Sequence, residues 1–214
     1  MAEISQIVDY DSLQQAIAEE LNRADLSAKI PLFIQMFEKA YNKDPRGRIQ
    51  DSVVISTADI ADDLTPVPAD YIQMQNLRIP SSQCNPEGLQ LCTSQQIGWF
   101  RARYSVAGEP LYYAIVGGRL RLLPIPDLEY VFEMEYFAKI PPLSATNETN
   151  WLLNDHPDIY LYGALMHAEP YLKNDERIAT WGKLYGDLME SLNTTDDRAQ
   201  FSGDTMKMRT RSFG

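Results

Sequence analysis

The spacing of hydrophobic residues changes twice along this chain of 214 residues, and the changes limit what it can fold into. Up to about residue 43, and again after residue 155, apolar positions recur every three or four residues, as on one face of an α-helix. From about residue 50 to 140 they alternate with polar positions, as in a half-buried strand. The sequence therefore predicts an α+β protein. Four helices from the two ends of the chain pack together, and an antiparallel β unit is inserted between them.

Two helices are predicted near the N-terminus. The first is capped by Asp11 or Ser12, and its apolar face is Leu13, Ile17, Leu21 and Ala24. The second is capped by Ser27, and its apolar stripe is Ile30, Phe33, Ile34, Phe37 and Tyr41. About four residues join them, which favours an antiparallel helical hairpin.

The middle of the chain predicts short strands. Residues 52–57, Ser-Val-Val-Ile-Ser-Thr, are rich in β-branched side chains, and residues 58–69 predict a connection. The alternation shifts by one residue at Asn76, which predicts a β-bulge. Residues 99–104 fit either a strand or a loop.

The clearest hairpin covers residues 112–123. Gly117 and Gly118 at its centre supply the positive φ angles that a two-residue turn requires. In the next strand, residues 130–136, aromatic and Met side chains face one way while Glu133 and Glu135 face the other.

A polar loop over residues 141–154 ends in the apolar group Trp151-Leu152-Leu153. Asp155 is the predicted cap of a third helix that is apolar around most of its circumference and extends to about residue 172. Asn174 is the predicted cap of a fourth helix, whose apolar seam is Ile178, Trp181, Tyr185, Leu188 and Leu192. Periodicity is lost after the polar run of residues 193–197.

The charge of the chain argues against two classes of function. Its net charge is −11, whereas a protein that grips nucleic acid or an anionic membrane needs a basic surface. The charge is uneven: residues 198–214 carry four basic residues and one acid, a net +3, which leaves −14 for the rest. No apolar run has the length of a membrane span, no signal peptide is expected, and Cys84 and Cys92 are predicted to be free thiols.

The sequence contains no nucleophile elbow, phosphate-binding loop, dinucleotide fingerprint or zinc-protease motif. His156 and His167 lie eleven residues apart, too far on one helix to share a metal ion. The carboxylates Glu133 and Glu135, or the group Asp155, His156 and Asp158, are the only candidates for a hydrolase site. Acidic residues are common on the solvent-facing side of a strand, and acidic and polar residues are common at the start of a helix. These roles explain the candidates better, so no catalytic residue, metal or cofactor is predicted.

Three features predict partners. The third helix carries more apolar surface than its own core needs, so we expect Tyr160, Tyr162, Met166, His167 and Tyr171 to contact another subunit or a partner protein, together with Trp151 from the loop. The basic C-terminal tail interleaves charge with apolar anchors, namely Met206, Lys207, Met208, Arg209, Arg211 and Phe213. Such a tail can become ordered on a partner, or it can be a dispensable terminus.

Most of the chain, residues 10–195, resembles the head-to-tail adaptor (connector) proteins of tailed bacteriophages. The likeness rests on DSLQQAIAEELNRADLSAKIPLFIQMFEKAYNK, on PVPADYIQMQNLRI, and on LLPIPDLEYVFEMEYFAKIPPLS followed by TNWLLNDHPDIYLYGALMHAEPYLKNDERIATWGKLY. The predicted domains are a helical domain of residues 1–48 and 150–197, a β subdomain of residues 49–149, and an extended tail of residues 198–214.

The resemblance implies a non-enzymatic structural protein of the virion, assembled in the host cytoplasm. Such adaptors form a ring under the portal protein, of twelve subunits as the resemblance suggests, which extends the DNA channel and presents a surface to tail nozzle, fibre or other neck proteins. The resemblance also implies that the basic tail reaches the portal. An acidic ring would repel DNA rather than grip it, as a conduit requires. A tail-completion or tail-terminator protein of the same neck is the alternative.

Overall fold

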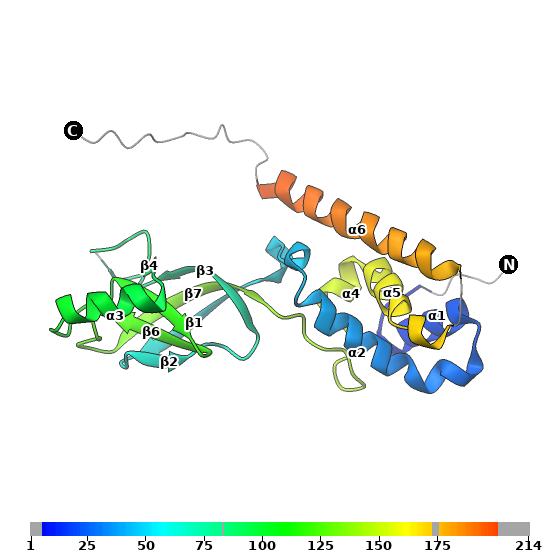
Figure 1. The fold of residues 1–214 in the computed structure, drawn as a ribbon, viewed down its shortest axis with the longest axis horizontal. Coiled ribbons are helices and arrows are strands. Elements are labelled where there is room, and N and C mark those ends of the chain that lie inside the picture. The colour runs from blue at the N-terminus through cyan, green and yellow to red at the C-terminus, as the bar shows by residue number, and fades with distance from the viewer. Residues whose placement is uncertain (1–5, 83, 173–175, 201–214) are drawn as a thin grey trace. The chain divides into compact units, whose positions relative to one another are not determined.

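The computed structural model describes residues 6–82, 84–172 and 176–200, and these divide between two units. The helical unit contains Met1–Gln50 and Pro141–Gly214, and the β unit contains Asp51–Ile140 (Figure 1). The α+β class predicted from the sequence is confirmed. The polar loop that was expected with the β subdomain belongs to the helical unit, because the division falls before Pro141.

The helical unit contains five of the α-helices: α1 (Tyr10–Leu21), α2 (Ile30–Tyr41), α4 (Trp151–Asp155), α5 (Pro157–Met166) and α6 (Arg177–Gln200). The 3-10 helix η1 (Ala24–Lys29) leads into α2, η2 (Pro45–Gly47) follows it, and η4 (Glu169–Tyr171) follows α5. The cap of α1 is Asp9 rather than Asp11 or Ser12. Its side chain accepts from the Ser12 amide at 2.8 Å, and the Ser12 hydroxyl accepts from the Asp9 amide at 2.9 Å.

Helix α5 is the centre of the helical unit, where it packs against α1, α2, α4 and α6. Its apolar circumference is therefore largely used inside the unit, which explains much of the apolar excess noted in the sequence. The contact with α2 is close at Gly163, where a Cβ atom would overlap the ring of Phe37. Buried residues of the other helices complete this core: Leu13, Ile17 and Leu21 from α1, Phe33 and Phe37 from α2, and Trp181 and Met189 from α6.

The β unit consists of two small sheets. The first has the order β1-β7-β3, from β1 (Val53–Ile60), β7 (Tyr130–Ala138) and β3 (Tyr71–Arg78). The second has the order β2-β6-β5-β4, from β2 (Leu64–Pro66), β6 (Arg119–Leu123), β5 (Tyr112–Val116) and β4 (Gln90–Leu91). All pairs are antiparallel except β4–β5, which is parallel.

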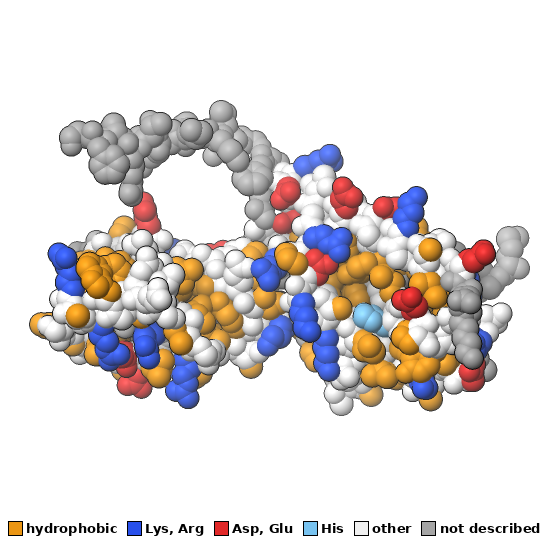
Figure 2. Space-filling model, viewed as in Figure 1, with side chains coloured by type: hydrophobic (Ala, Val, Ile, Leu, Met, Phe, Trp, Pro, Cys, Tyr) orange, Lys and Arg blue, Asp and Glu red, His pale blue; other side chains and the backbone are white. Residues whose placement is uncertain are grey.

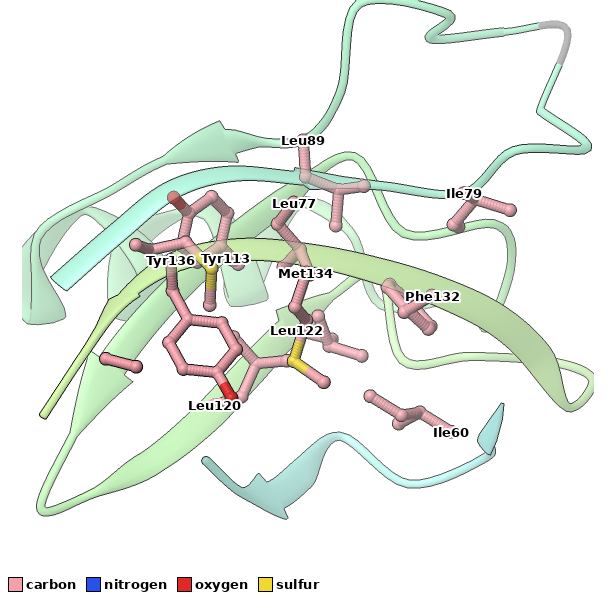
Figure 3. Close-up of a cluster of buried hydrophobic side chains, with 12 residues drawn as sticks. Ile60, Leu77, Ile79, Leu89, Tyr113, Leu120, Leu122, Phe132, Met134 and Tyr136 are labelled. Atoms are coloured by element: carbon pink, nitrogen blue, oxygen red, sulfur yellow. The ribbon is translucent and has the colours of Figure 1, made fainter. Parts of the chain in front are cut away.

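Alternating side chains of the two sheets form a shared hydrophobic cluster, with Leu77 and Phe132 from one sheet and Leu122 from the other (Figure 3). Helix α3 (Ser94–Arg103) covers the opposite face of the second sheet, where Ile97 packs on Ala114 and Leu123. The predicted hairpin turn is confirmed, with φ of 61° at Gly117 and 71° at Gly118. The bulge predicted at Asn76 is also confirmed, because the β3–β7 register shifts between Met74 and Asn76.

Several predicted boundaries were wrong. Residues 94–103 form α3, not a strand or loop, because Thr93 and Gln96 make a capping box that starts a helix. Residues 58–69 contain the end of β1 and all of β2. The third predicted helix is shorter than expected, since α5 ends at Met166 and is followed by η4, and α4 lies in residues that were predicted as a polar loop. Helix α6 continues to Gln200, beyond the predicted loss of periodicity. The predicted cap Asn174 lies outside the described residues.

Candidate assembly surfaces

A buried hydrogen-bond network fixes the loop that leads into α4. The carboxylate of Glu38, on α2, accepts from the amide of Leu143 at 2.8 Å and from the hydroxyl of Tyr160, on α5, at 3.2 Å. Asn150 donates through Nδ2 to the Tyr160 hydroxyl at 2.7 Å and to the carbonyl of Pro141 at 2.8 Å. Its Oδ1 accepts from the amide of Leu153 at 2.9 Å. Two helices and the loop are thus joined through buried side chains.

Burial sets the electrostatics of this network. Burial raises the pKa of Glu38, although the hydrogen bonds from Leu143 and Tyr160 oppose the rise. Burial and the neighbouring Glu38 carboxylate also raise the pKa of Tyr160. Tyr160 was predicted to meet a partner, but its side chain is fully buried inside the helical unit. There its hydroxyl links Asn150 at the end of the loop to Glu38 on α2.

Four other predicted contact residues follow one another along α5 and η4, and each is partly exposed: Tyr162, Met166, His167 and Tyr171. The Met166 side chain lies beside Gly182 of α6, and the Tyr171 ring lies 5.4 Å from that of Phe33. Burial lowers the pKa of His167, which favours its neutral form. Figure 2 shows hydrophobic side chains gathered around a histidine at the surface of this unit.

Trp151, the remaining predicted contact residue, is the first residue of α4 and is half-buried. Its ring meets that of Tyr41 on α2 edge-on, with a centroid distance of 6.5 Å. The Asn150 cap fixes where α4 begins, and therefore where Trp151 stands on the surface.

Helix α2 adds exposed apolar residues that the sequence analysis missed. Leu32 and Met36 lie one helical turn apart and are each more than two-fifths exposed. Lys29, one turn earlier, places its ammonium 4.2 Å from the centre of the Tyr171 ring. The exposed stripe of α2 thus borders the α5–η4 face. We call Leu32, Met36, Tyr162, Met166, His167 and Tyr171 the helical face.

The β unit exposes apolar residues of its own. Ile55 on β1 is 65% exposed and Val131 on β7 is 51% exposed. Trp99 on α3 is 64% exposed, and its ring stands 5.1 Å from that of Phe100. None of these was predicted, although the period-2 pattern already placed Val131 on the outer side of its strand.

The six tail residues predicted to bind a partner, Met206, Lys207, Met208, Arg209, Arg211 and Phe213, lie outside the described residues.

The residues considered for a hydrolase site take part in contacts that stabilise strands and helix ends. Glu133 forms an ion pair with Arg78 of β3, whose Nε donates to it at 2.8 Å. Asp158 accepts from the amide of Ile159 at 2.9 Å, within the first turn of α5. Across the described residues, no group of three or more metal-ligating side chains comes together. In the same residues, no helix has the length and apolar character to cross a membrane.

The family model described as SU10 adaptor protein matches residues 8–209, which include both units and part of the tail. No curated protein matches the chain.

Proposed function

The chain belongs to the SU10 adaptor protein family, a head-to-tail adaptor family of bacteriophages, and we propose that its subunits form a ring under the portal. The single observation that carries this proposal is the family match, which extends over both units. The protein is a structural component of the phage particle. In the proposed role it extends the DNA channel, presents a surface to tail components and catalyses no reaction.

A ring requires two different contact surfaces on each subunit, because its interfaces are heterologous. We assign the helical face to one of them. Its residues are partly exposed, and most are aromatic or Met, the residue types enriched where proteins associate. Trp151, half-buried on the same unit, is assigned to the same contact.

The network of Glu38, Asn150 and Tyr160 supports this assignment because it holds α2, α4 and α5 together. A rigid surface loses little conformational entropy when a neighbouring subunit binds to it. The role of Tyr160 in assembly is therefore to position its neighbours.

The second assignment is the C-terminal tail, which we propose binds the portal. Lys207, Arg209 and Arg211 supply charge, and Met206, Met208 and Phe213 supply apolar anchors. Basic groups steer association with an acidic partner, and buried anchors then slow dissociation. The body of the subunit, at −14 without residues 198–214, would repel DNA in the channel.

Purified subunit mixed with purified portal tests the proposal, with mass and shape measured by native mass spectrometry and electron microscopy. We expect a ring stacked on the portal ring, with the same number of subunits in each. Deletion of residues 203–214 should abolish the complex. If the shortened chain binds as tightly as the full chain, the tail is not the anchor.

The helical face is tested by Met36→Asp, which places a charge on a side chain that is 41% exposed and so spares the core. The variant should still fold but fail to close a ring on the portal. Val106→Asp is the matched control, because Val106 is 79% exposed and lies in the β unit. Equal ring formation by both variants would show that the helical face is not a subunit contact.

A further inference from the structure

The β unit has two outer faces on opposite sides. Its two sheets pack over the shared hydrophobic cluster, so the outer face of each sheet points away from the other sheet (Figure 3). Helix α3 lies over the outer face of the second sheet (Figure 1). In the described part of the β unit, no α-helix covers the outer face of the first sheet. The unit therefore exposes two unlike surfaces, one on a bare sheet and one beside a helix.

The bare sheet exposes apolar side chains next to acidic ones. Even-numbered residues of β7 point into the cluster, so its odd-numbered residues and their partners on β1 point outward. Among them, Ile55 is 65% exposed and lies opposite Glu135, and Val131 is 51% exposed and lies opposite Asp59. Each of these pairs sets an apolar side chain beside a carboxylate. We call the four residues the sheet face.

The ion pairs of the β unit leave the two carboxylates of the sheet face uncompensated. Glu133, another outward acid of β7, forms an ion pair with Arg78. Within the described residues, neither Asp59 nor Glu135 takes part in an ion pair. Asp59 is exposed and Glu135 is partly exposed, so both can meet a basic group of a partner.

Helix α3 exposes an aromatic ring beside a basic side chain. Of the residues of α3, only Ile97 is buried, and Trp99 is 64% exposed. Arg103 is exposed one helical turn after Trp99, so the two side chains lie on one side of the helix. Arg101 is already paired with Asp63, at 3.0 Å. Figure 2 shows Lys and Arg side chains beside exposed hydrophobic ones at the surface of the β unit.

Strand β6 adds two arginines on the same side of the unit. Leu120 and Leu122 point into the cluster, so the residues between and before them point to the side of the sheet that α3 covers. These residues are Arg119 and Arg121. Within the described residues, no ion pair includes Arg103, Arg119 or Arg121. We call Trp99, Arg103, Arg119 and Arg121 the arginine face.

The charge of the arginine face is opposite to that of the chain. Residues 94–123 carry four arginines and one glutamate, a net +3, whereas the net charge of the whole chain is −11. An exposed aromatic ring among basic groups is suited to a partner that presents apolar and acidic groups together. The sheet face of another copy has this composition.

We propose that the arginine face of one copy packs on the sheet face of the next copy in the ring. Trp99 then covers Ile55 and Val131, and the arginines lie beside Asp59 and Glu135. Because the two faces differ and lie on opposite sides, each copy uses one of each kind, as a heterologous contact requires. The inference rests on the proposed function, and it adds a contact between β units to the contact of the helical face.

The apolar and charged residues have different roles in this contact. A Trp side chain buried at the centre of an interface supplies much of the affinity. Exposed ion pairs contribute little, whereas like charges in contact are costly. Two sheet faces in contact would oppose acids to acids, and two arginine faces would oppose bases to bases. The charges therefore select the head-to-tail pairing over either symmetric one.

Charge reversal tests the pairing in the full chain mixed with portal. One variant carries Arg103→Glu and Arg119→Glu, and the other carries Asp59→Lys and Glu135→Lys. Alone, each variant should need at least about tenfold more subunit than the native chain to form the ring, because like charges then meet. An equal mixture should assemble as the native chain does, because each reversed face meets the reversed face of the other variant in an alternating ring. Native mass spectrometry measures the assembly and the proportion of the two chains.

The mixture contains the same substitutions as the separate variants, so its assembly also shows that both variants are folded. Native assembly by each variant alone would overturn the inference. Loss in both variants without rescue in the mixture would overturn it as well. Loss in the arginine variant alone would assign the arginine face to another acidic partner, such as the DNA backbone, and would also overturn the contact with a second copy.

Cross-linking tests which residues meet. Gln95 is exposed one turn before Trp99, and Thr57 is exposed between Ile55 and Asp59. Chains with Gln95→Cys and chains with Thr57→Cys, both with Cys84→Ser to remove the exposed native thiol, are mixed on portal. A short bismaleimide should join one chain of each kind, and either variant alone should give no linked pair. Linkage within one kind of chain would overturn the head-to-tail arrangement.

The native chain mixed with portal separates failure of this inference from failure of the proposed function. If the native chain forms the ring but the mixtures show neither rescue nor cross-linking, the contact between β units is wrong and the proposed function stands. If the native chain forms no ring on portal, the proposed function is wrong, and this contact is wrong with it.

Discussion

Different interactions specify the structures of the helical unit and the β unit. Among the described residues, the buried polar side chains are Glu38, Asn150 and Ser52, and the first two share a network in the helical unit. The β unit is one continuous segment, Asp51–Ile140, and its cluster between the sheets is apolar. A strand shifted by one residue would turn its apolar side chains outward, so alternation constrains the register of β7.

The helical unit is assembled from two segments that the β unit separates in the sequence. Apolar helix faces can pack in several arrangements, whereas a buried carboxylate and amide must find their partners or pay a desolvation penalty. The difference between the units is therefore that polar hydrogen bonds fix the discontinuous unit and side-chain alternation fixes the continuous one. Four substitutions test it.

The largest loss is expected for Phe132→Ala in the β unit. Phe132 is fully buried in the cluster, so its removal should lower the free energy of unfolding by about 3–5 kcal/mol. Denaturant unfolding followed by Trp99 fluorescence, with Trp151 and Trp181 replaced by Phe in both chains compared, reports this unit. Val131→Ala is the matched control at the exposed neighbouring position and should change the free energy by less than about 0.5 kcal/mol. A loss of equal size in the transition of the helical unit would show that the two units unfold together.

Gly163→Ala should destabilise the helical unit by about 2–3 kcal/mol, because the added methyl group would overlap the Phe37 ring. In an exposed helix the same substitution stabilises by about 1 kcal/mol, and Gly186→Ala on α6, where the methyl group meets open space, should do so. Thermal unfolding followed by helical circular dichroism measures both. A gain of stability in both variants would contradict the close contact between α5 and α2 at Gly163.

Asn150→Ala removes the cap of α4 and the donor to Pro141 and Tyr160. The expected loss is about 2 kcal/mol in the helical unit alone. Asn147→Ala is a control in the same loop, where an exposed amide donates to the carbonyl of Pro142 at 2.8 Å. Its loss should be below about 0.5 kcal/mol in the same denaturation experiment. Similar losses for both would contradict a special role for the buried network.

Glu38→Gln should have the smallest effect, and the effect should depend on pH. Burial raises the pKa of Glu38 above its usual 4.5, so the folded chain binds more protons at this site than the unfolded chain. Its contribution to stability is then greatest below that pH and falls as pH rises through the folded pKa. Gln does not titrate.

The stability of the variant relative to the native chain should therefore rise from about pH 4 to pH 7, by about 1.4 kcal/mol for each unit of the raised pKa. Urea unfolding of both chains at several pH values measures this slope, whatever constant offset the new amide introduces. A flat difference, or one that falls toward pH 7, would show that burial does not raise the pKa of Glu38.

Sequence patterns predicted the parts of the fold that depend on interactions between residues close together in the sequence. The Gly117-Gly118 turn, the bulge at Asn76 and the apolar stripe of α2 each followed from neighbouring residues. Helix α3 was missed because it buries only Ile97 completely, so its periodicity is weak, although the Thr93–Gln96 capping box was available as a signal. The end of α6 was missed because its last turns are polar and exposed, and exposed turns need no apolar period.

The surfaces were harder to predict than the fold. Glu38 is an acidic residue on a helix, and its burial depends on the Leu143 amide, which lies 105 positions away in the sequence. Tyr160 and Tyr162 are two residues apart in an apolar helix, yet one is fully buried and the other partly exposed. The neighbours on α1, α2 and α6 decide which side is covered, and a single sequence does not specify how those helices are arranged.

The pairing of β1 with β7 has a consequence for how such a protein can diversify. Val53 lies opposite Phe137, so the chain leaves the helical unit and returns to it through two adjacent strands. A different insert whose ends lie one strand spacing apart could replace the β unit, including α3, without repacking any helix of the helical unit. Phages could then exchange the whole insert by recombination and change what the neck presents, while the helical scaffold is inherited unchanged.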